Sequence, residues 1–284
     1  MNYELGEHPI TLDARVDAAL AEALAQGSFT VPLLPEVAAQ VMKETSREDW
    51  NGSTVVELLK RDAAMAANLL RLANSVAFKG ASPAVSLQQS VARLGAANVR
   101  QLAVVIACET RVFQVPGFEA EVRHLFRHSL TCAFAAREVA RSRRANVEEA
   151  FLSGLLHDVG WPLMLQVLLD VTKRVGVRVD RTSLLATAGR HHAPLASHLA
   201  TTWQLPERLR GALQLHHDEQ FTGATAESAA TLALADALAR ARECDPAMTP
   251  EVVHAHPSLA VLNVYPDSLD ALLAKAPTWW AEAA

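Results

Sequence analysis

The chain has 284 residues, of which 50% are hydrophobic and 20% charged, a composition typical of a globular protein with a large core. Its formal net charge of -5 excludes a protein that binds nucleic acid directly through a broadly basic surface. Three cysteines without a CxxC spacing exclude a disulfide framework and indicate a reducing compartment.

The N-terminal residues and the apolar runs predict where the protein resides. The first ten residues, MNYELGEHPI, carry acids and no apolar segment, so they do not read as a secretory signal. The longest apolar runs, such as LAVVIAC, are far shorter than a membrane span requires. We therefore expect a cytoplasmic protein that does not associate with a membrane.

Helix is predicted almost throughout the chain. Alanine and leucine recur at spacings of three and four, aromatic residues make up 5%, and strand-like alternation is nearly absent. Proline, serine and glycine mark the helix ends of the first half, with Ser53 and Ser86 as caps and Gly27 and Gly95 as stops. The helices predicted there are 12–26, 35–44, 53–60, 63–74, 86–95 and 97–108.

The stretch QVPGF at 114–118 carries Pro and Gly together and is the best candidate for a subdomain junction. Together with the helical pattern, this junction predicts an all-α protein of two packed helical subdomains, 1–115 and 116–284. The helices predicted in the second subdomain are 119–143, 147–157, 161–169, 183–203, 206–216, 226–242 and 268–276.

Histidines cluster in the second half of the sequence. Of eleven histidines, eight lie between His124 and His217. The more specific positions recur in a set order, which is His128, the HD pair His157–Asp158, the pair His191–His192, the pair His216–His217 and finally Asp236. Taken singly, each has an ordinary structural explanation, such as capping at a helix end or packing in a core. Together, they supply imidazole and carboxylate groups that suit Zn, Fe, Mn or Ni, and facing helices of a bundle can project them inward.

Six stretches resemble, in order, the HDOD (HD-related output domain) family. They are VPLLPEVAAQVMKE, LLKRDAAMAANLLRLANSVAF, SLQQSVARLGAANVRQLAV, EEAFLSGLLHDVGW, HAPLASHLATTWQLPERL and LQLHH. The resemblance covers about residues 31–239, and the pieces LRLANS and AFLSGLLHD are specific to the family. It implies an N-terminal helical bundle packed on an HD-like helical subdomain, and a role as an output module in bacterial signal transduction.

The wider HD superfamily, which includes the HD-GYP cyclic-dinucleotide phosphodiesterases, is similar around its metal ions. The positions of this sequence that match its ligand pattern are His128, His157, Asp158, His192, His216, His217 and Asp236. His192 is favoured over His191 because it opens HAPLASHL, which aligns with the family's His-led helix. By that resemblance Asp158 bridges two metal ions. One ion is completed by His128, His157 and Asp236, and the other by His192, His216 and His217.

Beyond the ligands, the sequence departs from what the phosphodiesterases use for hydrolysis. The phosphodiesterases carry a lysine directly after their HDxG motif, where this sequence has Trp161, and the GYP segment after the double histidine is absent. Arg190, Arg127 and Arg123 are the candidates to replace that lysine. If the protein is an enzyme, Asp158 and Arg190 are the expected catalytic residues.

Two functions from different classes therefore stay open. The first is a non-catalytic signalling module that retains one or two divalent transition-metal ions and acts through a protein partner. The second is a metal-dependent phosphohydrolase for cyclic dinucleotides or nucleotides with an altered phosphate clamp. No organic cofactor is implied, and no sensor or cyclase module is visible, so we expect a stand-alone module.

The C-terminal stretch APTWW places two tryptophans, Trp279 and Trp280, close together. Two alternatives stay open for them. They pack back on the bundle or, if exposed, they are anchors for a protein partner or for a second copy of the chain in a homodimer.

Overall fold

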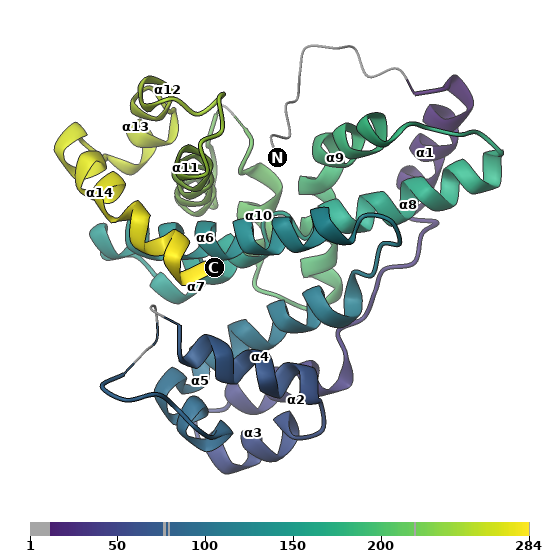
Figure 1. Ribbon diagram of the computed structural model, residues 1–284. Coiled ribbons are helices and arrows are strands. Elements are labelled where there is room, and N and C mark those ends of the chain that lie inside the picture. The colour runs from purple at the N-terminus through teal and green to yellow at the C-terminus, as the bar shows by residue number, and fades with distance from the viewer. Residues whose placement is uncertain (1–11, 76–77, 79, 219, 284) are drawn as a thin grey trace.

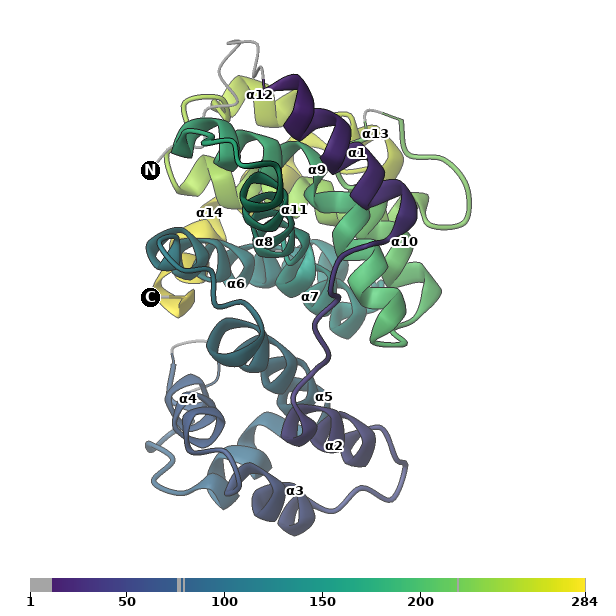
Figure 2. The same ribbon diagram turned by 90° about the vertical axis from the view of Figure 1, so that its right-hand side faces the viewer.

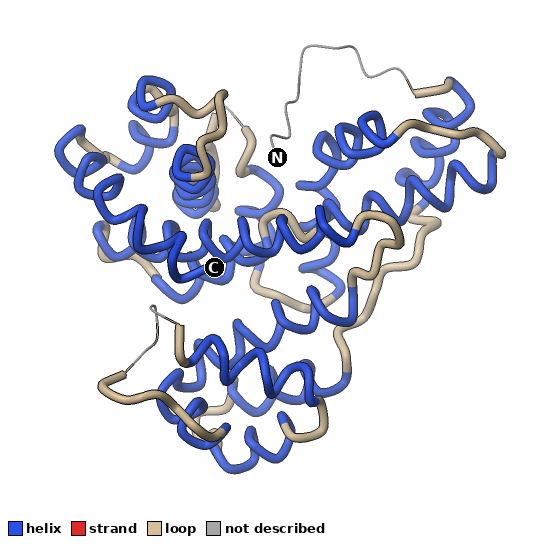
Figure 3. The backbone as a smooth tube through the Cα atoms, in the orientation of Figure 1, coloured by secondary structure: helices blue, strands red, loops and turns tan. Residues whose placement is uncertain are grey.

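The computed structural model describes residues 12–75, 78, 80–218 and 220–283. This part of the chain forms helices joined by turns and loops and contains no strand, which confirms the all-α prediction (Figures 1 and 3). The helices are α1 (Ala14–Gln26), α2 (Glu36–Thr45), α3 (Gly52–Leu59), α4 (Ala63–Ala73), α5 (Leu87–Ala107), η1 (Cys108–Val112), α6 (Glu119–Ser142), α7 (Val147–Leu156), α8 (Gly160–Val175), α9 (Arg181–Thr202), α10 (Glu207–Leu215), α11 (Ala226–Arg242), α12 (Pro250–His254), α13 (Ser258–Leu262) and α14 (Pro266–Ala283).

The helices are arranged in two lobes, which Figure 2 separates clearly. The lower lobe consists of α2 to α5, with α5 packed against each of the other three. The upper lobe contains α6 to α14, in which α6 packs against α7, α11 and α14, and α8 packs against α9. A hydrogen bond from Gln101 Nε2 of α5 to the Glu148 carbonyl of α7, 2.7 Å long, joins the two lobes.

Local chemistry explains where the helices of the lower lobe begin and end. Asn51, and not the predicted Ser53, caps α3, because its side chain accepts the backbone N–H of the second and third residues that follow it. Asp62 caps α4 in the same way. Gly95 has φ 71° and ψ 169°, which breaks α5 into two helical segments at the predicted stop.

Helix α1 lies on the upper lobe although it comes first in the chain. It packs against α8, and the linker that follows it runs down to α2 (Figure 2). Trp203 Nε1, at the end of α9, donates a hydrogen bond of 3.0 Å to the Pro32 carbonyl in this linker. The contacts of α1 therefore place it with the upper lobe, although it lies within the predicted subdomain 1–115. For the rest of the chain, the subdomain boundary at residue 115 stays a prediction.

Other boundaries differ from the expectation in ways that have simple causes. Helix α8 runs to Val175 instead of ending at 169, because the nearest residue that stops it in a left-handed conformation is Gly176. The short helices α12 and α13 and the π-helix η1 were not expected, since elements of one turn leave little periodicity in a sequence. The side chains of Trp279 and Trp280 lie outside the described part of the structure.

Two helical stretches are longer than the apolar runs from which the sequence analysis excluded a membrane span. Leu87–Thr110 and Val147–Val175 reach the length and hydropathy of a membrane-crossing helix. Within the structure, however, 61% and 78% of their apolar windows are buried. Their apolar side chains therefore already form the core around which the upper and lower lobes are built.

Candidate metal centre

The His157–Asp158 pair lies in the turn between α7 and α8, and two glycines let the neighbouring helices approach it. A Cβ on Gly154 would lie 2.5 Å from a backbone Cα of α6, and a Cβ on Gly160 would lie 2.5 Å from a backbone nitrogen of α9 and closer still to a carbonyl there. Real Cβ atoms do not approach backbone so closely, so only glycine fits at either position. These contacts hold the pair between α6 and α9.

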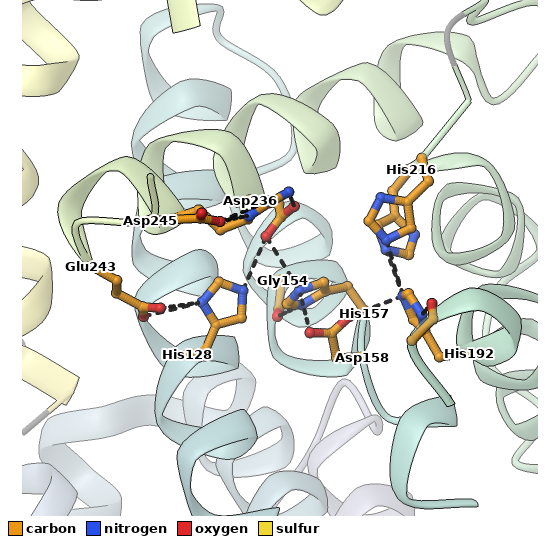
Figure 4. Close-up of polar contacts among 12 residues, drawn as sticks. His128, Gly154, His157, Asp158, His192, His216, Asp236, Glu243 and Asp245 are labelled. Carbon is orange, nitrogen blue, oxygen red and sulfur yellow. Dashed lines mark hydrogen bonds and ion pairs between the residues drawn. The ribbon is translucent and has the colours of Figure 1, made fainter. Parts of the chain in front are cut away.

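The first set of candidate ligands is the inner group, which consists of His128 of α6, His157, and Asp236 of α11. All three side chains are buried. His128 Nε2 lies 3.0 Å from Asp236 Oδ1, and His157 Nε2 lies 3.8 Å from the same oxygen (Figure 4). The predicted ligands of one ion therefore converge from three separate stretches of the chain.

The second set is the outer group, which consists of Asp158, His192 of α9, and His216 and His217 at the end of α10. His192 Nε2 lies 3.3 Å from His216 Nε2 and 3.1 Å from His217 Nε2. Asp158 and His217 are the more exposed members, while His192 and His216 are buried. The outer group thus contains the predicted ligands of the other ion, and His191 belongs to neither group.

Asp158 stands between the two groups. Its Oδ2 lies 3.1 Å from His157 Nε2 of the inner group, and its Oδ1 lies 3.1 Å from His192 Nε2 of the outer group. One carboxylate therefore offers a different oxygen to each group. This is the arrangement that a bridging ligand requires, although ligation itself stays a prediction.

The backbone fixes the orientation of three of the histidine rings. Nδ1 of His157, His192 and His216 lies 2.9, 2.6 and 2.7 Å from the backbone carbonyl three residues earlier in the chain. A carbonyl only accepts, so Nδ1 carries the hydrogen and Nε2 carries the lone pair. In the neutral rings the lone pairs of His192 and His216 face each other at 3.3 Å. His157 Nε2 is buried 3.1 Å from Asp158 Oδ2, without a well-aligned hydrogen bond among the described residues.

Such an arrangement is unfavourable without a cation. The lone pairs of the neutral His192 and His216 rings repel at 3.3 Å, and a buried nitrogen without a well-aligned partner costs free energy. A metal ion removes both penalties, and ring nitrogens held by carbonyl groups are typical of metal ligands. The mixed imidazole and carboxylate donors of both groups fit divalent Fe, Mn, Zn or Ni.

Comparison with known families decides the classification. The model of the HDOD domain family matches residues 31–219, which is more than half of the chain. This chain belongs to the HDOD family. The match contains the whole lower lobe and every candidate ligand except Asp236, which lies 17 residues beyond its end.

Solved structures support the same architecture for this HDOD protein. A candidate metal-dependent phosphohydrolase from Shewanella amazonensis matches with a TM-score of 0.75 and 19% identity, covering 96% of this chain and 100% of its own. A candidate phosphohydrolase from the same organism matches with a TM-score of 0.69 and 25% identity, covering 94% and 97%. An HDOD domain protein of unknown function from Geobacter sulfurreducens has a TM-score of 0.68 and 22% identity, covering 95% and 97%.

An uncharacterized protein of Treponema pallidum (strain Nichols) is 24% identical over 209 residues. The match covers 70% of the HDOD chain described here but 40% of the relative. The chain therefore spans less than half the length of this curated relative.

The charges in the HDOD centre favour a bound cation. Burial alone would raise the pKa of the Asp158 carboxyl, but His157 and His192 hold it well below its usual range. Burial acts to raise the pKa of Asp236 as well, but His128, together with His157 and Arg240, lowers it and keeps this carboxyl anionic. Both carboxylates therefore carry their negative charge at neutral pH, as metal binding requires.

The histidines of the two groups differ in their ionisation. Burial acts to lower the pKa of His128, but hydrogen bonds to Asp236 and Glu243 raise it well above its ordinary value. Burial and the neighbouring His217 lower the pKa of His216 well below the ordinary value. Without metal, His128 therefore tends toward the protonated form and His216 stays neutral.

The sequence did not point to the residues that support the ligands. Both carboxylate oxygens of Glu243 lie 3.1 Å from His128 Nδ1, and Arg240 lies 3.9 Å from Asp236 while pairing with Asp245 at 2.7 Å. Glu243 follows Asp236 by seven residues, which is close to two helical turns, so both carboxylates face the same side. That spacing is the one signal that could have revealed Glu243.

At the position where the phosphodiesterases carry a lysine, this protein has a buried tryptophan. The Trp161 side chain is only 5% exposed and packs in the hydrophobic core. Arg190 is exposed on α9 next to His191, while Arg123 and Arg127 line a cleft between the lobes. Asp218 is exposed, and its neighbour at position 219 lies outside the described residues.

Proposed function

We propose that this HDOD protein is a bacterial signal-transduction output module that holds one or two divalent transition-metal ions and acts through a protein partner. Its inner group would hold one ion and its outer group the other, with Asp158 shared. In this role the metal stabilises the folded output state, since an ion that binds only the folded protein adds to its stability by mass action. We propose that it works in the cytoplasm.

Two observations carry the proposal: the candidate ligands converge in two groups, and the buried Trp161 closely follows the HD pair in the chain. The Nε2 atoms of His216 and His217 lie 3.3 and 3.1 Å from that of His192, a convergence that gives a physical reason to retain metal. The position where the phosphodiesterases have a lysine holds a buried indole, which cannot neutralise phosphate charge. A centre with ligands but without this cation favours binding over turnover.

The likeness of the chain to signalling proteins adds support. A protein from Marinobacter aquaeolei described as a candidate signal-transduction protein matches with a TM-score of 0.61 and 20% identity, covering 96% of this chain and 67% of its own. That description applies to the Marinobacter protein. For the present chain, the net charge of -5 supports a protein partner over direct nucleic-acid binding.

A second candidate function is metal-dependent phosphohydrolysis of cyclic dinucleotides or nucleotides. Its support is the bridging position of Asp158 and the descriptions of the two Shewanella proteins. A bound divalent ion would supply an activated water at neutral pH. The residues of this chain would have to hold the phosphate, and Arg190 is the cation nearest in sequence to a ligand of the outer group.

One experiment separates the two functions. The protein is purified without chelator, its Fe, Mn, Zn and Ni are measured, and the same sample is assayed on a bis-aryl phosphate and on cyclic dinucleotides. Bound metal without turnover supports the output module. Turnover that disappears in Asp158→Asn would overturn the non-catalytic role, and no metal before or after reconstitution would overturn both.

A further inference from the structure

A second concave site lies between the lobes, and none of the candidate metal ligands lines it. It has a volume of about 360 Å³ and is lined by α4, α5 and η1 from one side and by α6 from the other. Figure 2 shows α6 directly above the lower lobe that supplies the other walls. The volume falls within the range of small-molecule binding sites, roughly 300–1,000 Å³.

The polar lining of this interlobe cleft is mainly cationic. Arg71 of α4 and Arg123 and Arg127 of α6 line it together with one acid, Glu109 of η1. His124 of α6 also lines it, and burial lowers its pKa and so favours the neutral ring. Two of these arginines, Arg71 and Arg123, therefore outnumber the one carboxyl group that lines the cleft. Burial raises the pKa of Glu109, although Arg71 and Arg123 act to lower it. A concave site with this excess of positive charge attracts an anion.

Two of these arginines are available to a ligand. The side chains of Arg71 and Arg123 are exposed. Within the ranges that the structure describes, no ion pair of 4.0 Å or less involves either guanidinium. Since Arg71 is on α4 and Arg123 is on α6, an anion held by both would contact the two lobes at once.

Apart from Asn68, the rest of the lining is apolar. Leu72, Leu102, Ile106 and Phe126 contribute buried side chains to the walls. A free inorganic anion would leave these surfaces in water, whereas a ligand with an apolar or aromatic body would cover them. Positive charge and apolar surface in one cavity indicate a ligand that has both an anionic group and an apolar body.

We propose that the interlobe cleft binds an organic phosphate, a small molecule that joins a phosphate group to an apolar or aromatic body. Guanidinium groups bind phosphate through paired, charge-assisted hydrogen bonds, and its several oxygens can be shared among arginines of two helices. His124 lies one helical turn before His128, so α6 connects this cleft to the inner group of the metal centre. The site is independent of whether metal is bound.

The probe for this site is phenyl phosphate, measured by titration calorimetry on the full chain after removal of metal. Inorganic phosphate tests the charge alone, and benzyl alcohol tests the apolar body alone. We expect phenyl phosphate to bind more tightly than either. Arg71→Met and Arg123→Met should each weaken it about tenfold, because each removes a charge-assisted contact. Arg174→Met, which changes an exposed arginine of α8, should bind like the wild type.

The results separate this cleft from the metal centre. Binding that persists in metal-free Asp158→Asn and falls in the two cleft variants supports the proposal. Absence of saturable binding to the wild type, or equal binding by wild type and both cleft variants, overturns it. Binding of phenyl phosphate only when metal is present would also overturn it while leaving the metal centre intact. Circular dichroism of each variant confirms that the fold is unchanged.

Discussion

The inner and outer groups of the candidate metal centre use similar side chains in different surroundings. The inner group is fully buried, and its His128 is held on its second nitrogen by Glu243. The outer group has three histidines, and its His217 reaches the surface. Structural metal sites are closed by protein, whereas sites that exchange a ligand keep a position open. The inner group thus has the character of a structural site, and the outer group that of an accessible one.

The largest expected effect is on Asp158, the residue that both groups share. Asp158→Asn removes the negative charge while keeping the shape of the side chain, so both groups should lose metal affinity together. Metal content measured on the purified and reconstituted protein checks this. His191→Asn, next to a proposed ligand but outside both groups, should keep the wild-type metal content. Retention of one full equivalent by Asp158→Asn would contradict the bridging role.

Gly160→Ala should destabilise the fold and disturb the outer group in particular. Its Cβ would collide with the backbone of α9 at His192, and overpacking of this kind costs about 3 kcal/mol. Urea unfolding of the metal-free protein measures the cost. Gly52→Ala is the matched control, because its Cβ would make ordinary contacts at 3.6 and 3.7 Å. Equal stability of the two variants would show that α8 and α9 can separate freely.

Glu243→Gln should weaken the inner group alone. It replaces the carboxylate that orients His128, and loss of such a supporting partner lowers metal affinity about 10- to 100-fold. Competition with a chelator gives the affinity for each of the two equivalents of metal. Glu207→Gln, at an exposed position on α10, should have no effect. An equal loss of affinity for both equivalents of metal would contradict the prediction that Glu243 supports the inner group alone.

The smallest expected effect is on the pH dependence of the metal-free protein. His128 has a raised pKa, so its contribution to stability is present below the unfolded pKa of about 6.5 and is lost as pH rises through the raised value. His216 has a lowered pKa, so acidification below about 6.5 favours the unfolded chain, which takes up the proton.

The two histidine variants should therefore respond to acid in opposite directions. Between pH 7 and pH 5.5, His216→Gln should lose less stability than the wild type and His128→Gln more, each by roughly 1 kcal/mol. Urea unfolding at the two pH values measures the difference. A change of the same sign in both variants would contradict the contrast between the groups.

Much of the fold was predictable because helix ends have local causes. The stop at Gly95, the helix that ends at Gly27 and the start at Ala226 were all predicted from punctuation and periodicity. The HD pair and the order of the histidines gave the candidate ligands by resemblance, and the structure brings all of them together in two groups. These features depend on residue type and spacing, which a sequence records directly.

The sequence by itself determined the helical class, the family and the identity of the candidate ligands. Only the tertiary structure decided that α1 packs on α8, that Glu243 supports His128, and that Arg71 and Arg123 line one cleft. The physical reason is that each of these is a contact between residues far apart in the chain or on different helices. Such contacts depend on which faces of the helices meet, and helix periodicity alone does not fix that choice.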